Sequence, residues 1–514
     1  MTNNLKFSLP DGHDEKQFMR QLADQYTLKK EPAVAERFTL YDTFDWRLFN
    51  KSFILHSSGN KLYLRKLTKS EVLHSVEFSK TPVFIWDFPD GELKDKLAPI
   101  IKMRALIPIV EFHSRATRYR VFNRDEKTVA RLVYEQIKPS RSKRRSALKT
   151  HLSLKPVKGY PKYARNLVKS LKKAGLTICT EKEYFLNALA SAEKKPGSYS
   201  AKVNIQLDPA MRSDQAAKIV LGFLLKVMRT NEAIFEKDLD TEVLHDFRVA
   251  IRRTRSALAQ IKNVFPQPTT DRFKKNFAYV GKLSNDLRDL DVYLLNQEAY
   301  KEMLPVVLRE DIDPLFRHLR KKRAKAFQRV MRGLNSKKYS KIMKDWETFL
   351  KKPLPESATA SNAEHPVNDL ARQRIYKKYK RVVKTGSKIL ANTEDEMLHF
   401  LRIECKKLRY LMEFFASLFP RKKINALIRQ LKNLQDNLGD FNDLCVQQEY
   451  LLNVVAELPA SQQQVKKTLV AIGSLIETLE EEKKAVKDAF ARTFTDFAAP
   501  ANQKLFQELF ASNA

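Results

Sequence analysis

Two segments of the sequence carry histidine and basic residues at the same spacing. The first, LHDFRVAIRRTRSAL, covers residues 244–258, and the second, LHFLRIECKKLRYLM, covers residues 398–412. At a constant offset of 154 residues, five positions align: His245 with His399, Arg248 with Arg402, Arg252 with Lys406, Arg253 with Lys407, and Arg255 with Arg409. Guanidinium groups bind phosphate oxygens in a bidentate fork, lysine acts as a point charge, and histidine adds a donor. These residue types are typical of an anion site.

Helical geometry gives this repeated pattern a meaning. At about 100° per residue, the histidine and three of the basic residues of each segment share one stripe, beside an apolar stripe. The stripes comprise His245, Arg248, Arg252 and Arg255 in the first segment, and His399, Arg402, Lys406 and Arg409 in the second. One basic amphipathic helix is usually a solvated face, and one histidine there is usually a packed residue. Two matching stripes that face each other would repel unless an anion lay between them, so we expect a shared anion site.

The repeat extends beyond these two segments. Each is followed by Phe-Pro, at Phe265-Pro266 and Phe419-Pro420, again 154 residues apart. Farther on, LRDLD at 287–291 resembles LGDFN at 438–442 at an offset of 151, which a three-residue slip in a connecting turn would explain. The sequence therefore predicts a duplicated multi-helix unit. The nearby carboxylates could be metal ligands, but helix caps or ion pairs with the arginines are favoured; they are Asp289, Asp291, Asp440 and Asp443.

The rest of the chain divides into a strand-rich and a helical part. Alternating polar and apolar residues predict strands at 61–65, 118–121 and 130–135, and two helices are expected near 14–26 and 161–174, the second ending at Gly175. Helical periodicity then predicts helices near 210–237, 240–263, 271–298, 312–333, 337–351, 366–391, 394–417, 421–438, 440–457 and 460–492. A Pro- and Ser-containing linker at 353–366 separates the repeats, which span about 210–352 and 366–495.

Composition sets the class of protein and of partner. The 514 residues have a net charge of +35, which indicates a polyanionic partner, while 43% hydrophobic residues exclude global disorder. The charge is uneven, since residues 101–200 hold 24 basic and 7 acidic residues, whereas residues 1–50 hold 7 and 8. Three scattered cysteines fit neither a disulfide framework nor a zinc cluster. Because neither a signal peptide nor a membrane-spanning apolar segment is visible, we expect a cytoplasmic protein.

The paired motif, the Phe-Pro that follows it, and the segments LRDLDV and LQDNLGDFNDL resemble the CHAD family, the conserved-histidine α-helical domain. The resemblance covers about 210–495. It implies two four-helix bundles, related by a pseudo-twofold axis, around a basic channel that binds inorganic polyphosphate without catalysis, cofactor or metal. The polyphosphate contacts that it implies are His245, Arg248, Arg252, Arg253, Arg255, His399, Arg402, Lys406, Lys407 and Arg409. Lys321 and Lys378 are candidate additions on charge alone. It also suggests association with polyphosphate granules.

The N-terminal part is similar to the CYTH, or triphosphate-tunnel, family. The similarity lies in residues 41–66 and in 108–136, which include Arg115, Arg118 and Arg120. Members with activity carry Glu-x-Glu-x-Lys on the first strand, where the carboxylates hold a divalent metal. Here that strand reads Asn4-Leu5-Lys6-Phe7-Ser8-Leu9, so only the lysine remains. We expect a degenerate domain without hydrolytic activity, and anion binding by it is left open.

Together these patterns predict a two-domain α+β protein. An antiparallel, tunnel- or barrel-like β domain with helices occupies residues 1–205, and an all-α CHAD domain of two bundles occupies 206–500. Two other functions are kept open. The first is metal-dependent hydrolysis of tripolyphosphate or nucleoside triphosphates by the N-terminal domain. The second is nucleic-acid binding, which fits the charge, although no basic groove interleaved with aromatic residues is evident on these helices. No membrane partner is expected.

Overall fold

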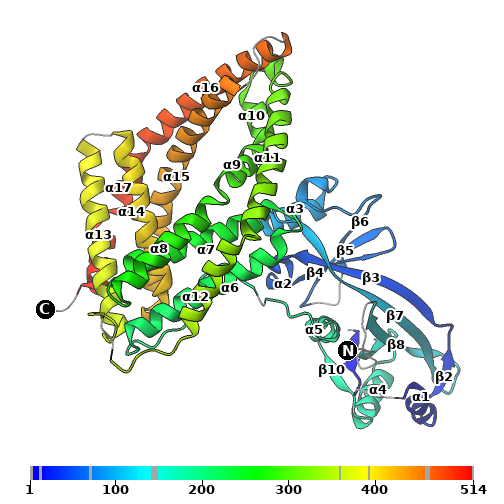
Figure 1. Ribbon diagram of the computed structural model, residues 1–514. Helices are drawn as coiled ribbons and strands as arrows, with labels where there is room; N and C mark the ends of the chain where they lie inside the picture. The colour runs from blue at the N-terminus through cyan, green and yellow to red at the C-terminus, as the bar shows by residue number, and fades with distance from the viewer. Residues whose placement is uncertain are drawn as a thin grey trace. The chain divides into compact units, whose positions relative to one another are not determined.

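The computed structural model describes residues 4–10, 14–68, 72–140, 149–197, 199–357, 360–391, 394–457 and 463–511. The chain divides into a sheet unit, residues 1–200, and a helical unit, residues 201–514 (Figure 1). The predicted two-domain α+β class is therefore confirmed. The predicted boundary at 205/206 lies in the coil that precedes the first helix of the helical unit.

The sheet unit is built on an antiparallel sheet of ten strands. The strands are β1 (Leu5–Ser8), β2 (Thr27–Lys30), β3 (Val34–Thr43), β4 (Phe53–Ser58), β5 (Lys61–Lys66), β6 (Val72–Glu77), β7 (Leu106–Phe122), β8 (Thr128–Pro139), β9 (Lys149–Pro156) and β10 (Thr177–Cys179). Their order is β10-β1-β9-β8-β7-β3-β4-β5-β6, and β2 pairs with β7. The three strands predicted from alternation lie within β5, β7 and β8, so these predictions are confirmed.

Helices cover both faces of this sheet. They are α1 (Glu15–Ala23), α2 (Arg47–Asn50), α3 (Glu92–Ile101), α4 (Pro161–Lys173) and α5 (Glu181–Ser191). Helices α1 and α4 pack on the face that carries Phe7 and Leu152, and α4 is followed by Gly175 at φ +85°, as a C-cap requires. Lys6 precedes Phe7 and so points to the opposite face, where it contacts α5. The sheet unit thus has an apolar face under α1 and α4 and a polar face next to α5.

The helical unit contains the duplication that the sequence predicts. The first repeat comprises α6 (Ser213–Phe235), α7 (Thr241–Gln260), α8 (Gln267–Lys282), α9 (Asn285–Leu295), α10 (Gln297–Met303), η3 (Val306–Leu308), α11 (Asp313–Leu334) and α12 (Lys337–Lys351). The second comprises α13 (Val367–Ala391), α14 (Asp395–Phe414), η4 (Ala416–Leu418), α15 (Arg421–Glu457), α16 (Gln463–Asp488), α17 (Phe490–Phe497) and α18 (Pro500–Phe510). Helices α13, α14 and α15 begin 154 residues after α6, α7 and α8.

Three helix boundaries differ from the sequence prediction. The helix predicted over 271–298 is broken at Leu283-Ser284 into α8 and α9, and the two predicted at 421–438 and 440–457 are one helix, α15. The helix predicted over 460–492 ends at Asp488 and is followed by two short ones. The α8–α9 break accounts for the three-residue slip between the repeats. Gly439 does not interrupt α15, because the flanking Leu438 and Phe441 are buried and offset the roughly 1 kcal/mol that a mid-helix glycine costs.

The predicted linker at 353–366 returns to the start of α6. Residues 358 and 359 of this segment lie outside the described residues. Ser213 and Asp214 donate backbone hydrogen bonds to the carbonyl oxygens of His365 and Ala363, both at 3.0 Å. The linker therefore ties the two repeats together at their first helices. Within the described residues, no helix has an apolar stretch long enough to cross a lipid bilayer.

Candidate anion-binding site

The two repeated helices, α7 and α14, pack against each other (Figure 1). At the start of α7, the Asp240 side chain accepts hydrogen bonds from the backbone N–H groups of Glu242 and Val243, each at 3.0 Å, which is a typical N-cap. The apolar stripe of α7 is buried, as expected for an amphipathic helix; it comprises Leu244, Phe247, Ile251 and Leu258. The basic stripes lie beside it, with Arg252, Arg255 and His399 exposed and the other five residues half-buried.

Cations from both repeats converge around Arg252. Burial is the largest cause that lowers the pKa of Arg402 and of Lys406 in the second repeat, and the charge of Arg252 in the first repeat lowers both further. The pKa of Lys406 falls to about 8, with Arg402 and Arg409 contributing and Asp443 opposing. A charge on α7 thus acts on two groups of α14, in keeping with the packing of these two helices. That the two stripes face one another along their whole length stays a prediction.

Arg248 is held in place by neutral groups. Its Nη1 donates to Ser284 Oγ at 3.1 Å and to Asn285 Oδ1 at 2.9 Å, at the α8–α9 break. Burial, followed by the Arg252 charge, lowers its pKa to about 10, so it stays protonated at neutral pH. Its buried Nε has no hydrogen-bond partner among the described residues. Arg248 therefore keeps a spare donor, and the nearby Asp289 carboxylate offsets part of its charge without a direct ion pair among the described residues.

The second repeat holds its corresponding arginine differently. Arg402 Nη2 lies 3.2 Å from Asp443 Oδ1, and its buried Nε likewise finds no partner within the part of the chain that the structure describes. The amide nitrogen of Asn442 also donates to Asp443, at 3.3 Å. This orients the Asn442 oxygen toward His399, whose Nδ1 donates to it at 2.7 Å. The His399 ring is thereby fixed, and its Nε2 can donate to an anion when the ring is protonated.

Two of the residues that the resemblance implies as contacts have carboxylate partners on α14. Arg253 bonds to Glu413 at 2.6 Å, and its guanidinium lies 5.6 Å from the centre of the Tyr410 ring. Lys407 lies 2.7 Å from Glu404, a fully buried carboxylate that also holds Lys378 at 2.7 Å. Arg253 and Lys407 occupy equivalent positions, off the stripe of their helices. Lys378, which was a candidate on charge alone, is thus paired with the buried Glu404 carboxylate.

The remaining candidate residues have distinct surroundings. His245 lies half-buried at the position that corresponds to His399, and Lys321 is exposed on α11. Arg409 Nε lies 3.6 Å from Glu413 Oε1, so its charge is partly offset. Arg255 is exposed next to Gly281 of α8, where a Cβ would lie 3.8 Å from its Nη1.

Two of the four carboxylates near the site form ion pairs. Asp291 accepts from Arg323 at 2.7 Å, and Asp443 pairs with Arg402, as the favoured interpretation expects. Among the described residues, no group of three or more His, Cys, Asp or Glu side chains could hold a metal ion. The sequence analysis did not identify Asn442 and Ser284 as neighbours of the site. The 151-residue offset aligns Asn442 with Asp291, and this alignment could have pointed to the position.

Basic and aromatic side chains also meet on α13 and α14, which the sequence did not suggest. The Lys380 ammonium lies 4.5 Å from the centre of the Tyr376 ring, and the Arg381 guanidinium lies 5.2 Å from that of Phe400. These pairs give the helical unit a basic surface with aromatic residues. A nucleic-acid competitor is therefore a necessary control for any binding assay.

Cations on the polar face of the sheet unit have partners of their own. Lys6 lies 3.1 Å from Glu181 of α5, and its ammonium stands 3.5 Å from the centre of the Tyr184 ring. Arg65 lies 4.0 Å from the same carboxylate. β1 supplies Lys6 but neither carboxylate of the Glu-x-Glu-x-Lys pattern. The first strand therefore does not fit the metal site of an active triphosphate tunnel.

Comparison with known proteins gives a family match. Residues 220–452, which include both α7 and α14, match the model of the CHAD domain. The chain is similar to the crystal structure of the CHAD domain from the plant Ricinus communis, with 24% identity, coverage of 58% of this chain and 96% of that chain, and a TM-score of 0.48. It is also similar to PptA from Streptomyces chartreusis, with 15% identity and a TM-score of 0.44. That match covers 55% of this chain and 99% of PptA. No curated protein matches the sequence.

Proposed function

Because the chain contains a CHAD domain over residues 220–452, we propose that its helical unit binds inorganic polyphosphate between α7 and α14 without catalysis. The observation that carries the proposal is the packing of α7 on α14, with the charge of Arg252 acting on Arg402 and Lys406 of the other repeat. Such cations repel one another, and an anion between them would be attracted to each of them. The proposed contacts are the two stripes: His245, Arg248, Arg252, Arg255, His399, Arg402, Lys406 and Arg409.

The length of the stripes favours an extended anion over a single phosphate. His245 and Arg255 are ten residues apart on one helix, so their Cα atoms are separated by about 15 Å along its axis. A single phosphate reaches only a few of these groups, whereas a phosphate chain presents oxygens along the whole stripe. Arg253 and Lys407 are assigned to the ion pairs with Glu413 and Glu404. A cytoplasmic, granule-associated location goes with this proposal.

The test replaces His245, Arg252, His399 and Lys406 together by alanine. We expect affinity for polyphosphate of defined length to fall at least about tenfold, since several charge-assisted hydrogen bonds are lost. Calorimetry measures the affinity, and circular dichroism checks that helicity is kept. A matched control replaces Lys341 and Lys344, which are exposed on α12, and so also removes one pair of basic side chains. Equal affinity of the site variant and this control would rule out the α7–α14 site.

Competition separates this function from the two alternatives. Excess single-stranded RNA or DNA should displace polyphosphate poorly, because the stripes carry no aromatic platform of their own. Efficient displacement would favour a nucleic-acid-binding protein. Release of phosphate from tripolyphosphate in the presence of Mg²⁺ or Mn²⁺ would instead favour hydrolysis by the sheet unit.

A further inference from the structure

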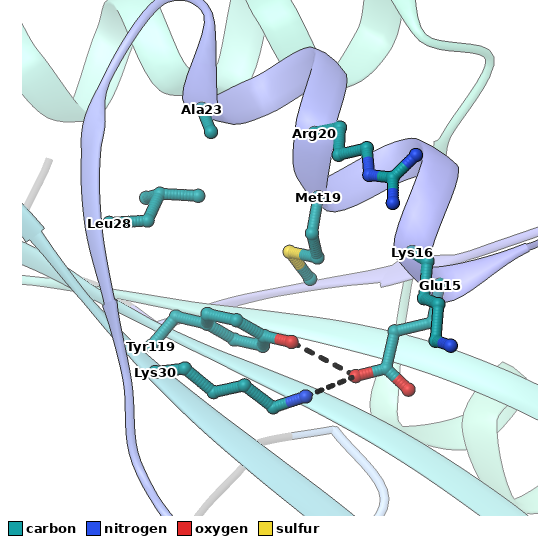
Figure 2. A pocket seen from close by; sticks show the side chains of 8 residues that line it. All are labelled: Glu15, Lys16, Met19, Arg20, Ala23, Leu28, Lys30 and Tyr119. Atoms are coloured by element: carbon teal, nitrogen blue, oxygen red, sulfur yellow. Dashed lines mark hydrogen bonds and ion pairs between the residues drawn. The ribbon is translucent and has the colours of Figure 1, made fainter.

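A separate hollow lies on the sheet unit between α1, β2 and β7 (Figure 2). Its volume is about 290 Å³. Tyr119, which lines it, belongs to the same buried cluster as Phe7, so the hollow opens on the face of the sheet opposite Lys6 and Glu181. It is therefore distinct from both the α7–α14 site and the polar face of the sheet.

One wall of this pocket is apolar. Met19 and Ala23 of α1, Leu28 of β2 and the ring of Tyr119 form it, and Figure 2 shows Met19 extending toward the Tyr119 hydroxyl, with Leu28 across from it. Met19 and Tyr119 are 8% and 5% exposed, so both are fixed by packing. A flat apolar group that enters here replaces water on three hydrophobic side chains and one aromatic ring.

The polar end of the pocket is built from three side chains on three elements. The Tyr119 hydroxyl donates to Glu15 Oε1 at 2.9 Å, and Lys30 Nζ lies 4.0 Å from the same oxygen. The three groups converge in Figure 2. Burial, and then the contact with Glu15, raises the pKa of Tyr119, so its hydroxyl remains a donor. The Tyr119 hydroxyl and the Lys30 ammonium therefore stabilise the negative charge of Glu15.

Two further cations leave the lining with excess positive charge. Lys16 and Arg20 also line the pocket, and both are exposed on α1. They are four residues apart on this helix and so lie on the same side, where like charges destabilise a helix. Neither side chain has an ion-pair partner among the described residues. An anionic group bound by both would relieve their repulsion.

We propose that this pocket binds a small organic phosphate of mononucleotide size. Its planar ring packs against Met19, Leu28 and Tyr119, and its phosphate meets Lys16 and Arg20. The volume is at the lower end of ligand cavities, which are roughly 300–1,000 Å³, so it suits a small molecule rather than a polymer. The combination of an apolar wall and net positive lining favours an anion with a ring over inorganic phosphate.

The test is calorimetric titration of the full chain with AMP, adenosine and inorganic phosphate. AMP is expected to bind at least about tenfold more tightly than either fragment, because it engages both parts of the pocket. Replacing Lys16 and Arg20 by alanine should weaken AMP about tenfold and leave adenosine unchanged. Ala23→Trp, at an exposed position on the pocket wall, should remove AMP binding by filling the space.

The control is Lys29→Ala, which removes an exposed cation from β2 on the side of the strand away from Leu28 and Lys30. It should leave AMP affinity unchanged, as should the quadruple α7–α14 variant, so failure of this proposal is distinguishable from failure of the polyphosphate proposal. AMP binding no tighter than phosphate binding would overturn the pocket assignment. An equal loss of AMP affinity in the Lys29 and Lys16/Arg20 variants would overturn it as well.

Discussion

The cations on the polar face of the sheet unit and those around Arg252 in the helical unit have different surroundings. In the sheet unit, Lys6 and Arg65 pair with Glu181, and Arg120 pairs with Glu31 at 2.9 Å. In the helical unit, Arg252 faces Arg402 and Lys406 across the two repeats. The most basic hundred residues of the chain, 101–200, belong to the sheet unit. Charge density alone therefore does not distinguish cations that already have carboxylate partners from cations that lie near other cations.

The same contrast recurs between the two repeats. Arg248 is held by the neutral side chains of Ser284 and Asn285, whereas Arg402 is held by the carboxylate of Asp443. Arg409 likewise lies near Glu413. At the Arg248/Arg402 position the second repeat has a direct ion pair, whereas in the first repeat the Asp289 carboxylate acts on Arg248 without one. If polyphosphate binds as proposed, the two repeats should contribute unequally.

The largest effect is expected from reversing the central charge. Arg252→Glu places a carboxylate beside Arg402 and Lys406, so it satisfies these cations internally and repels a polyanion. We expect polyphosphate affinity to fall about a hundredfold, because like-charge juxtaposition costs several kcal/mol. Calorimetry of this variant against Lys341→Glu, the same reversal on exposed α12, measures the effect. Similar losses in both variants would show that only the overall charge matters.

The next effect concerns pH. In the protein without anion, the Lys406 pKa is lowered to about 8 by burial, Arg402 and Arg252. Since this is below its ordinary value of 10.5, protonated Lys406 disfavours the folded state, and this penalty disappears as pH rises from about 8 to 10.5. Anion binding needs the proton, so affinity for polyphosphate should fall about tenfold between pH 7 and pH 9.5. Titrations at several pH values measure this.

Lys406→Arg provides the matched control for pH, because arginine stays protonated throughout this range. The variant should bind with nearly the same affinity at both pH values. A fall equal to that of the unmodified protein would assign the pH dependence to another group and contradict the role of Lys406.

A smaller effect should separate the two repeats. Arg248→Ala is expected to weaken polyphosphate about tenfold, and Arg402→Ala about threefold, because Asp443 already offsets part of the Arg402 charge. Asp443→Asn should conversely strengthen binding about threefold. Its side chain is 64% exposed, so this change should leave folding intact. Equal losses for the two arginines, with no gain for Asp443→Asn, would remove the difference between the repeats.

The smallest effect on binding is expected from Lys407→Ala. This residue pairs with the buried Glu404, away from the stripe, so affinity should change less than about twofold. Stability should fall by about 1 kcal/mol, because Glu404 loses one of its charged partners. Chemical denaturation measures the second quantity. A large loss of polyphosphate affinity with unchanged stability would instead show that Lys407 contacts polyphosphate.

Particular elements show how far sequence reasoning reached. The 154-residue offset predicted the equivalence of α7 and α14, and helical spacing predicted which of their residues share a stripe. The break between α8 and α9 was not predicted, because residues 271–298 read as one amphipathic stretch. Ser284 is buried at that break and accepts from Arg248, so the break contributes to the site. Local periodicity carries no information about such a long-range contact.

The sequence by itself determined the two-part organisation, the duplication and the stripe positions, because repeats and periodicity are properties of residue order alone. The tertiary structure decided which cations are compensated, since the partners of Lys6, Arg253 and Lys378 come from other elements of the fold. It also decided that Arg252 lies near Arg402 and Lys406, and that α1, β2 and β7 enclose a pocket. Coulomb energy and burial depend on distance in space, and residues 150 positions apart acquire that distance only when the chain folds.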